Sequence, residues 1–370
     1  MNKNALMWAV VLLLAVLLLI GSLLYISGQV CRFALWKRCF GEGKAAALYA
    51  ALLVLAVLGT LWAIWGYADA VVCFLHVLAF WLLCNGVAWV IGRVSGTAPR
   101  NGVAGTAAIC ITVLWLSLGW YNAHHVRRTA YTLRDGDGEP FRIVGFSDSH
   151  VGALFSGRDM NAYVDRMNAE SPDAVVIVGD FVDDESSWED MAAACEALSR
   201  LKAKCGVFYV FGNHDSGYYS SRRGYGLEEL TERLRANGVR VLEDETVRLR
   251  GDYYLCGRLD AQGERKSASE LTEGHRDGYI IMLDHHPTDF AGEMSAGANL
   301  VLSGHTHGGQ LIPIRRLIGR LGKNDRVYGH EKRGDTNFIV SSGIGDWAID
   351  FKTGCISEYF VVDIVDNEAS

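Results

Sequence analysis

The chain begins with four apolar runs and continues with short apolar stretches that alternate with polar ones. The four runs carry no charge and lie at residues 7–26, 45–65, 70–91 and 103–121. Each is close to the ~20 apolar residues that cross a bilayer as a helix. The first run exceeds the ~7 to 15 apolar residues of a cleaved signal peptide, and more runs follow it. The pattern therefore predicts a membrane domain with four transmembrane helices at residues 1–126.

From residue 141 onward the periodicity changes to that of a mixed α/β domain. Residues 174–178 form a short run rich in β-branched side chains, which predicts a strand buried on both faces. Similar runs alternate with amphipathic helical patterns, first as parallel units and then as antiparallel pieces. This order predicts two stacked mixed sheets with helices outside, an αββα sandwich of four layers at residues 141–370. Residues 127–140, which contain D-G-D-G, are interpreted as a linker.

Basic residues between the apolar runs indicate the orientation in the membrane. Six lie in the loops after the first and third runs, which the positive-inside rule assigns to the cytoplasm. Four spans then place the α/β domain outside the cytoplasm. Lys3, Arg127, Arg128 and Arg134 oppose this orientation, because these four basic residues flank the spans on the other side.

Composition narrows the classes of partner. The formal net charge is -7 at pH 7, and most of it belongs to the second part of the chain, so we expect no nucleic-acid surface. The nine cysteines lack C-x-x-C spacing, which argues against a disulfide framework or a zinc knuckle. No pattern indicates an obligate protein partner.

Side chains that commonly bind metals follow five of the predicted strands, where open α/β folds place their chemistry. They are Asp148, His150, Asp180, Asn213, His285, His305 and His307. Oxygen and imidazole donors without a thiolate suit Mn, Fe, Zn, Co or Ni rather than calcium. Seven donors exceed the needs of one ion, so we expect two ions, ~3.5 to 4 Å apart. Asp180, directly after the buried strand, is the natural bridge between them.

Five motifs resemble those of a known family. In chain order they are D-S-H, G-D-F-V-D, G-N-H-D, D-H-H-P and G-H-T-H-G-G, and together they resemble the calcineurin-like metallophosphoesterases over residues 141–363. The resemblance is strongest to the bacterial membrane-associated branch that carries G-H-T-H-G-G-Q, which includes enzymes similar to UDP-diacylglucosamine hydrolases. It implies the metallophosphoesterase sandwich fold and two bound divalent metal ions. The membrane part lies outside it.

The resemblance also implies a role for each motif residue. Carried over by position, it gives one ion to Asp148, His150, Asp180 and His307, and the other to Asp180, Asn213, His285 and His305. His214 would be the acid next to the metals, and its alternative is a structural histidine after a strand. The family has one residue between ligand and proline, which favours His285 over its neighbour His286. Asp183 and Asp215 are expected to orient neighbouring groups.

The function that the resemblance implies is hydrolysis of a phosphomonoester, phosphodiester or pyrophosphate bond by metal-activated hydroxide. Manganese is one candidate ion, and a phosphorylated substrate is the expected partner. The alternative is a membrane receptor or transporter whose phosphoesterase-like domain only binds a phosphorylated ligand. The complete set of ligand types favours the enzyme.

A basic and apolar segment follows the last histidine motif. Residues 311–323 interleave cationic and aliphatic side chains, a mixture typical of surfaces that meet anionic lipid. Arg315, Arg316, Leu317 and Ile318 are therefore candidates for contact with membrane lipid or with a lipid-linked substrate. The alternative is an ordinary amphipathic segment packed on the domain with its basic face in water.

Overall fold

The computed structural model describes residues 3–97, 102–136, 139–217, 223–313 and 323–366. These residues divide into two compact units, Met1–Ser117 and Leu118–Ser370, and each is described by itself.

The first unit is built from apolar helices. Their bounds are α1 (Lys3–Val30), α2 (Ala34–Phe40), α3 (Lys44–Trp65), α4 (Tyr67–Ser95) and α5 (Val103–His124), whose last turns belong to the second unit. Of the described helices, α3, α4 and α5 are long and apolar enough to cross a membrane. Val16–Val30 and Ala34–Phe40, which meet at an angle of 86°, make a fourth span if the bent pair counts as one. The chain is therefore a membrane protein with three to four such helices.

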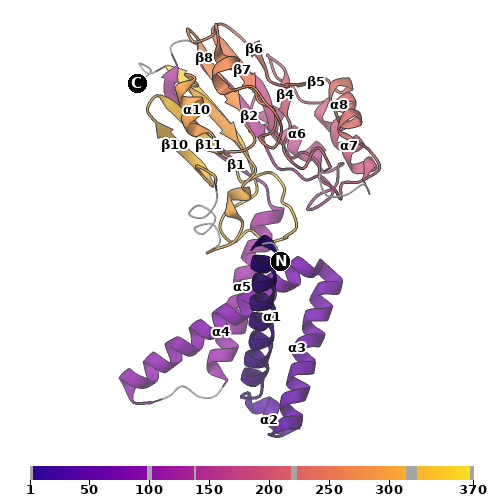
Figure 1. Cartoon of the computed structure of the whole chain (residues 1–370), viewed down its shortest axis with the longest axis vertical. Coiled ribbons are helices and arrows are strands. Elements are labelled where there is room, and N and C mark those ends of the chain that lie inside the picture. Colours follow the sequence, from indigo (N-terminus) through magenta and orange to yellow (C-terminus); the bar gives the residue numbers. More distant parts are fainter. Residues whose placement is uncertain (1–2, 98–101, 137–138, 218–222, 314–322, 367–370) are drawn as a thin grey trace. The chain divides into compact units, whose positions relative to one another are not determined.

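The second unit contains two six-stranded sheets (Figure 1). The first has the order β1 (Arg127–Gly136), β12 (Glu358–Asp366), β2 (Phe141–Phe146), β3 (Ala174–Val178), β4 (Val207–Val210) and β5 (Val239–Val241). The second has the order β10 (Gly329–Arg333), β11 (Thr336–Val340), β9 (Leu300–Ser303), β8 (Tyr279–Leu283), β7 (Tyr253–Gly257) and β6 (Glu245–Arg248). Most neighbouring strands are parallel: the first sheet has one antiparallel pair, β12 with β2, and the second has antiparallel pairs at its two edges.

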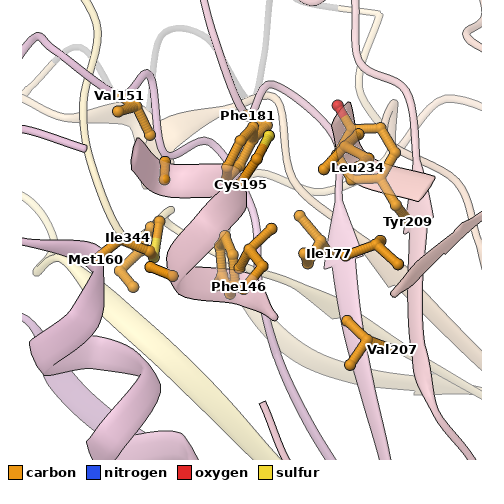
Figure 2. Packing of buried hydrophobic residues seen from close by; sticks show 14 of the residues in the cluster. Phe146, Val151, Met160, Ile177, Phe181, Cys195, Val207, Tyr209, Leu234 and Ile344 are labelled. Carbon is orange, nitrogen blue, oxygen red and sulfur yellow. The ribbon is translucent and has the colours of Figure 1, made fainter. Parts of the chain in front are cut away.

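Helices cover the outer faces of the two sheets. On the first sheet these are α6 (Met160–Ala169), α7 (Trp188–Leu198) and α8 (Leu227–Ala236). On the second sheet they are α9 (Ala268–Thr272) and α10 (Phe290–Ser295). Figure 2 shows the first of these layers, in which Met160 of α6 and Leu234 of α8 pack with Phe146 and Ile177 of the sheet.

Strand β3 shows why the sheets stack. Val175 and Ile177 face the helices, whereas Val176 and Val178 belong to the core between the two sheets. Since alternate side chains of a strand point to opposite faces, this strand is buried on both. The predicted αββα sandwich of two mixed sheets is therefore confirmed.

One segment differs from its sequence interpretation. Residues 127–140 were expected to be a linker, but Arg127–Gly136 forms β1, which pairs in parallel with β12. The reason is local alternation, because Leu133 is buried in the core between the sheets and Tyr131 packs against it. The D-G-D-G composition obscured this pattern of alternating apolar residues.

Candidate metal centre

The seven predicted ligands all follow the carboxyl ends of strands in the two sheets. Asp148 and His150 come after β2, Asp180 after β3, Asn213 after β4, His285 after β8, and His305 and His307 after β9. Parallel strands place these ends at one edge of each sheet, and the stacked sheets bring the two edges together. Three groups of donors result in which all ligand atoms lie within 4.8 Å of one another. They are Asp148/His150/His307, Asp148/Asp180/His285 and His285/His286/His305.

Asp180 lies at the middle of this arrangement. Its Oδ2 atom is 3.1 Å from His285 Nε2 and 3.8 Å from His150 Nε2. On one side, His307 Nε2 is 3.6 Å from Asp148 Oδ1. On the other side, His305 Nδ1 is 2.9 Å from Asn213 Oδ1. Two clusters of donors therefore flank one carboxylate.

Several of these donor atoms are buried without a hydrogen-bond partner. Among the described residues, none hydrogen-bonds to Asp180 Oδ2, His150 Nε2 or His285 Nε2. A buried polar atom without a partner costs free energy, so such atoms mark sites where something else binds. A shared carboxylate flanked by imidazole and carboxylate donors fits two divalent cations.

The backbone around the ligands is strained. Asp148, His150 and Asp180 have φ of 49°, 40° and 51°, and His305 and His307 have φ of 68° and 47°. Residues with a Cβ rarely adopt this left-handed region unless the surrounding structure enforces it, and such residues gather at functional sites. Five of the seven predicted ligands share this conformation.

Two glycines allow the ligand loops to approach one another. A Cβ at Gly212 would collide with the carboxylate of Asp180, and a Cβ at Gly304 would collide with that of Asp148. The G-N-H and G-H-T-H motifs therefore require glycine at these two positions for space.

Charge at the site favours the metal-binding forms of Asp180 and His305 but not of His285, where burial lowers the pKa and the charge of Asp180 raises it, to about 10. Burial alone would raise the pKa of Asp180, but the charges of His285 and His150 lower it well below its usual range. Burial lowers the pKa of His305, and the charges of His285 and His286 lower it further, to about 2. Asp180 is therefore ionised and His305 neutral at physiological pH, which are the states in which carboxylate and imidazole ligate cations.

A hydrogen bond or a nearby carboxylate adjoins the far nitrogens of two histidines. His150 Nδ1 is 3.5 Å from Asp183 Oδ2, and His285 Nδ1 is 2.8 Å from the carbonyl oxygen of Val178. In both rings Nε2 is the nitrogen that faces Asp180. Metal-binding histidines are commonly oriented by such contacts at the nitrogen that does not bind.

His286 differs from its neighbour His285. Its Nδ1 is 2.8 Å from Asp260 Oδ2, and its ring lies against that of His305 at 3.8 Å between centroids. His285 instead directs Nε2 at Asp180. The geometry gives the two adjacent histidines different surroundings, although both lie within reach of His305.

His214 lies beside the donors and is buried. Its backbone N–H donates to Asp180 Oδ1 at 2.8 Å. Its ring is 5.0 Å from that of His150 and 5.2 Å from that of Trp347, measured between centroids. Burial lowers the pKa of His214, and the negative charge of Asp180 opposes this shift.

The structure also shows neighbours of the site that the sequence analysis missed. Asp346 Oδ1 lies 3.0 Å from His307 Nδ1, and Gln310 Nε2 donates to the same carboxylate. The sequence signal for Asp346 was the motif G-I-G-D at residues 343–346, which follows a predicted strand closely. The predicted lipid-contact residues Arg315, Arg316, Leu317 and Ile318 lie outside the described residues.

Known proteins resemble this chain, and the residues that the family model matches lie in the second unit. The family model for calcineurin-like phosphoesterases matches residues 141–309. An "Uncharacterized metallophosphoesterase" of Helicobacter pylori is 34% identical over 218 residues, which cover 56% of this chain and 55% of the relative. The chain thus spans about half the length of that relative.

Two further relatives extend the comparison. An "Uncharacterized metallophosphoesterase" of Aquifex aeolicus is 32% identical over 247 residues, covering 64% of this chain and 90% of the relative. A "Transmembrane protein with metallophosphoesterase domain" of Bos taurus is 28% identical over 318 residues, covering 77% of this chain and 69% of the relative. On this similarity the chain belongs to the calcineurin-like phosphoesterase family.

Proposed function

We propose that this protein is an integral-membrane phosphoesterase that depends on two divalent metal ions and hydrolyses a phosphomonoester, phosphodiester or pyrophosphate bond. The observation that carries the proposal is the convergence of seven donor side chains from five strand ends, with the ionised and buried carboxylate of Asp180 between the other six. A domain that only bound phosphate would need cationic groups, and would not require unpartnered imidazole and carboxylate atoms that face one another.

Each ion would have its own side of Asp180. One would be held by Asp148, His150, Asp180 and His307, and the other by Asp180, Asn213, His285 and His305. Bound there, the two ions would supply a water deprotonated near neutral pH and would take up charge that develops on the phosphoryl oxygens. Mn, Fe, Zn, Co and Ni all suit these ligand types.

His214 would act as the general acid. Its backbone is fixed by the hydrogen bond to Asp180 Oδ1, which keeps the imidazole beside the donors. Burial lowers the pKa of the ring, whereas a substrate phosphate next to it would favour the imidazolium form. The imidazolium can then protonate the departing oxygen. Asp183 would orient His150, and Asp215 would hold the backbone of Asp180.

Hydrolysis of bis-p-nitrophenyl phosphate with added manganese tests the proposal. The wild type should hydrolyse it, and Asp180→Asn should lose both activity and bound metal. His214→Ala should lose roughly 10²–10⁴-fold on a phosphoester with an alkyl leaving group, and less on the nitrophenyl ester, which departs without protonation. Asp173→Asn, a buried carboxylate at the opposite end of β3, is the matched control. A metal-loaded wild type that binds phosphorylated ligands and turns none over would establish the receptor or transporter instead.

A lipid-linked substrate is the finer part of the proposal. Trp347, 46% exposed, lies against His214, so an exposed aromatic surface adjoins the proposed acid. The basic and apolar residues at 315–318 follow the last histidine motif closely in the chain. Both features suit a phosphorylated headgroup presented at a membrane surface.

The lipid proposal has its own test. Leu317→Ser with Ile318→Ser, and separately Arg315→Gln with Arg316→Gln, should depress turnover of a phospholipid substrate in liposomes and spare the soluble diester. Equal losses on both substrates would assign these residues to folding.

The side of the membrane is also part of the proposal. The basic loops favour an extracytoplasmic catalytic unit. Alkaline phosphatase fused after residue 370 should then be active in cells, and a fluorescent protein that matures only in the cytoplasm should be dark at the same position. The reverse pair of results would place the catalytic unit in the cytoplasm.

A further inference from the structure

The loop between β11 and β12 places a buried carboxylate behind the metal ligand His307. Asp346 is 1% exposed, and its Oδ1 atom lies 3.0 Å from His307 Nδ1. The same oxygen accepts hydrogen bonds from Gln310 Nε2 and from the backbone N–H of Trp347. Several groups therefore fix the carboxylate in place, and its charge lies against Nδ1 of the imidazole, a nitrogen with no hydrogen bond to any described residue.

The opposite nitrogen of His307 faces the proposed metal site. Its Nε2 lies 3.6 Å from Asp148 Oδ1, and both groups cluster with His150. The ring thus presents one nitrogen to Asp346 and the other to the metal donors. When a carboxylate holds the remote nitrogen of a metal-binding histidine, it sets the orientation of the ring and raises its basicity.

A buried lysine compensates the charge of Asp346. Lys352 is fully buried, and its ammonium donates to the carbonyl oxygens of Ser342 at 2.7 Å and Gly345 at 2.8 Å. Its Nζ lies 3.9 Å from Asp346 Oδ2. Burial alone would raise the pKa of Asp346, but Lys352 and His307 lower it, so the carboxylate stays ionised. A buried ammonium is costly unless paired, which explains why the two charges occur together.

The same lysine joins this loop to the end of α5. Its backbone N–H donates to Gly119 at 2.9 Å, and its carbonyl accepts from Asn122 Nδ2 at 3.2 Å. Ser357 Oγ adds a hydrogen bond to the carbonyl of Ala123 at 2.7 Å. All these residues belong to the second unit. The last turn of the helix and the loop that holds His307 are therefore parts of one hydrogen-bonded structure.

We propose that Asp346 is a positioning residue, which holds His307 Nδ1 so that Nε2 is presented to the ion shared with Asp148 and His150, while Lys352 fixes Asp346 to the last turn of α5. The proposal rests on the proposed function for the existence of two ions. It concerns how tightly one of them binds. Asp346 touches neither substrate nor the reacting atoms.

Cobalt titration of the metal-free full-length protein in detergent tests it, with visible absorption and metal content as readouts. The wild type should bind two Co²⁺. Asp346→Asn should bind one of them about 10–100-fold more weakly and leave the other unchanged. Asp346→Glu should recover part of the loss. Asp173→Asn should bind both ions like the wild type, since it removes a buried carboxylate far along β3 from the ligands.

A double variant separates positioning from stability. Lys352→Met alone leaves a buried carboxylate without its cation and should lower the unfolding temperature of the metal-free protein. Lys352→Met with Asp346→Asn removes both charges, so the unfolding temperature should recover while Co²⁺ affinity stays weak. If affinity returned together with stability, or if Asp346→Asn bound both ions like the wild type, the proposal would be overturned. Two tightly bound ions without hydrolysis would overturn only the proposed function.

Discussion

The carboxylate of Asp215 holds the strained backbone of Asp180. Its Oδ2 atom accepts hydrogen bonds from the N–H of Asp180 at 2.9 Å and of Gly212 at 2.7 Å. Its Oδ1 atom accepts from Phe181 at 2.9 Å and Val182 at 3.2 Å. One side chain thereby ties the loop after β3 to the loop after β4. The positive φ of Asp180 persists because its N–H group and those of the next two residues point at a single anion.

Asp215→Asn should therefore destabilise the protein strongly. An asparagine has one acceptor oxygen, and the NH₂ group that replaces the second oxygen would face two of the four N–H donors. Hydrogen bonds to a charged acceptor contribute ~1.5–3 kcal/mol each, but burial and the charge of Asp180 raise the pKa of Asp215 to about 6 and so oppose its ionised form; we expect the free energy of unfolding at pH 7 to fall by about 2–3 kcal/mol. Denaturant unfolding measures the change. Asp165→Asn, at an exposed ion pair, is the control and should cost less than about 1 kcal/mol. An Asp215→Asn protein as stable as this control would contradict the assignment.

Removal of metal should also destabilise the second unit. Without cations, Asp180, His150 and His285 keep buried atoms that lack hydrogen-bond partners among the described residues. Ligands that bind only the folded state stabilise it, by about 2.7 kcal/mol at a hundred times the dissociation constant. Thermal unfolding should therefore shift downward after treatment with a chelator and recover when manganese is added back. Asp180→Asn should show little of this response, and an unchanged transition in the wild type would argue against the site.

A second buried charge cluster lies beside the metal centre. The buried guanidinium of Arg258 has Asp284 and Asp289 oxygens at 2.9 Å from Nη1 and a Glu293 oxygen at 3.4 Å. Arg265 adds one more cation, 2.9 Å from Asp284. Three carboxylates thus share two cations. Burial, followed by the charge of Asp284, raises the pKa of Glu293 well above its usual value, and Arg258 opposes this only in part.

Glu293→Gln should therefore change how stability depends on pH. A carboxyl group whose pKa is higher in the folded protein than in the unfolded chain stabilises the folded state. This stabilisation is complete at pH values below the pKa of about 4.5 that the group has in the unfolded chain. This contribution is lost as pH rises toward the folded pKa. Relative to wild type, Glu293→Gln should gain stability steadily as the pH rises above about 5. Denaturant unfolding at a series of pH values, with exposed Glu232→Gln as control, measures the difference. A difference that is constant with pH would show that Glu293 is ionised throughout.

Most of the fold and the set of predicted ligands could be inferred because they depend on short stretches of sequence. β3 is recognisable from five consecutive apolar residues, and each ligand follows a strand within a few positions. The role of Asp346 depends instead on a contact with His307, 39 positions earlier in the chain. No spacing rule connects them, because their proximity arises only when β9 and β11 pair. β1 was missed partly for the same reason, since its partner β12 is distant in the sequence, and partly because D-G-D-G obscured its own alternation.

The end of α5 offers a last prediction. A Cβ at Gly119 would lie 2.8 Å from Thr353 Cγ2, in the segment directly after Lys352. Gly119→Ala gains roughly 1 kcal/mol of helix propensity, but overpacking costs about 1–3 kcal/mol, so a net loss of about 1 kcal/mol is expected.

Thr353→Ser removes only the colliding methyl group and keeps the hydroxyl oxygen that accepts from Ile312. Alone it should destabilise the protein slightly, whereas in the Gly119→Ala background it should raise the unfolding temperature. Because Lys352 joins this segment to Asp346, Co²⁺ affinity should fall in Gly119→Ala and recover in the double variant. A cycle of the four proteins, followed by thermal unfolding and cobalt titration, measures both effects. If stability recovered without any change in metal affinity at any corner of the cycle, the end of α5 would be packed against the loop but not coupled to the metal centre.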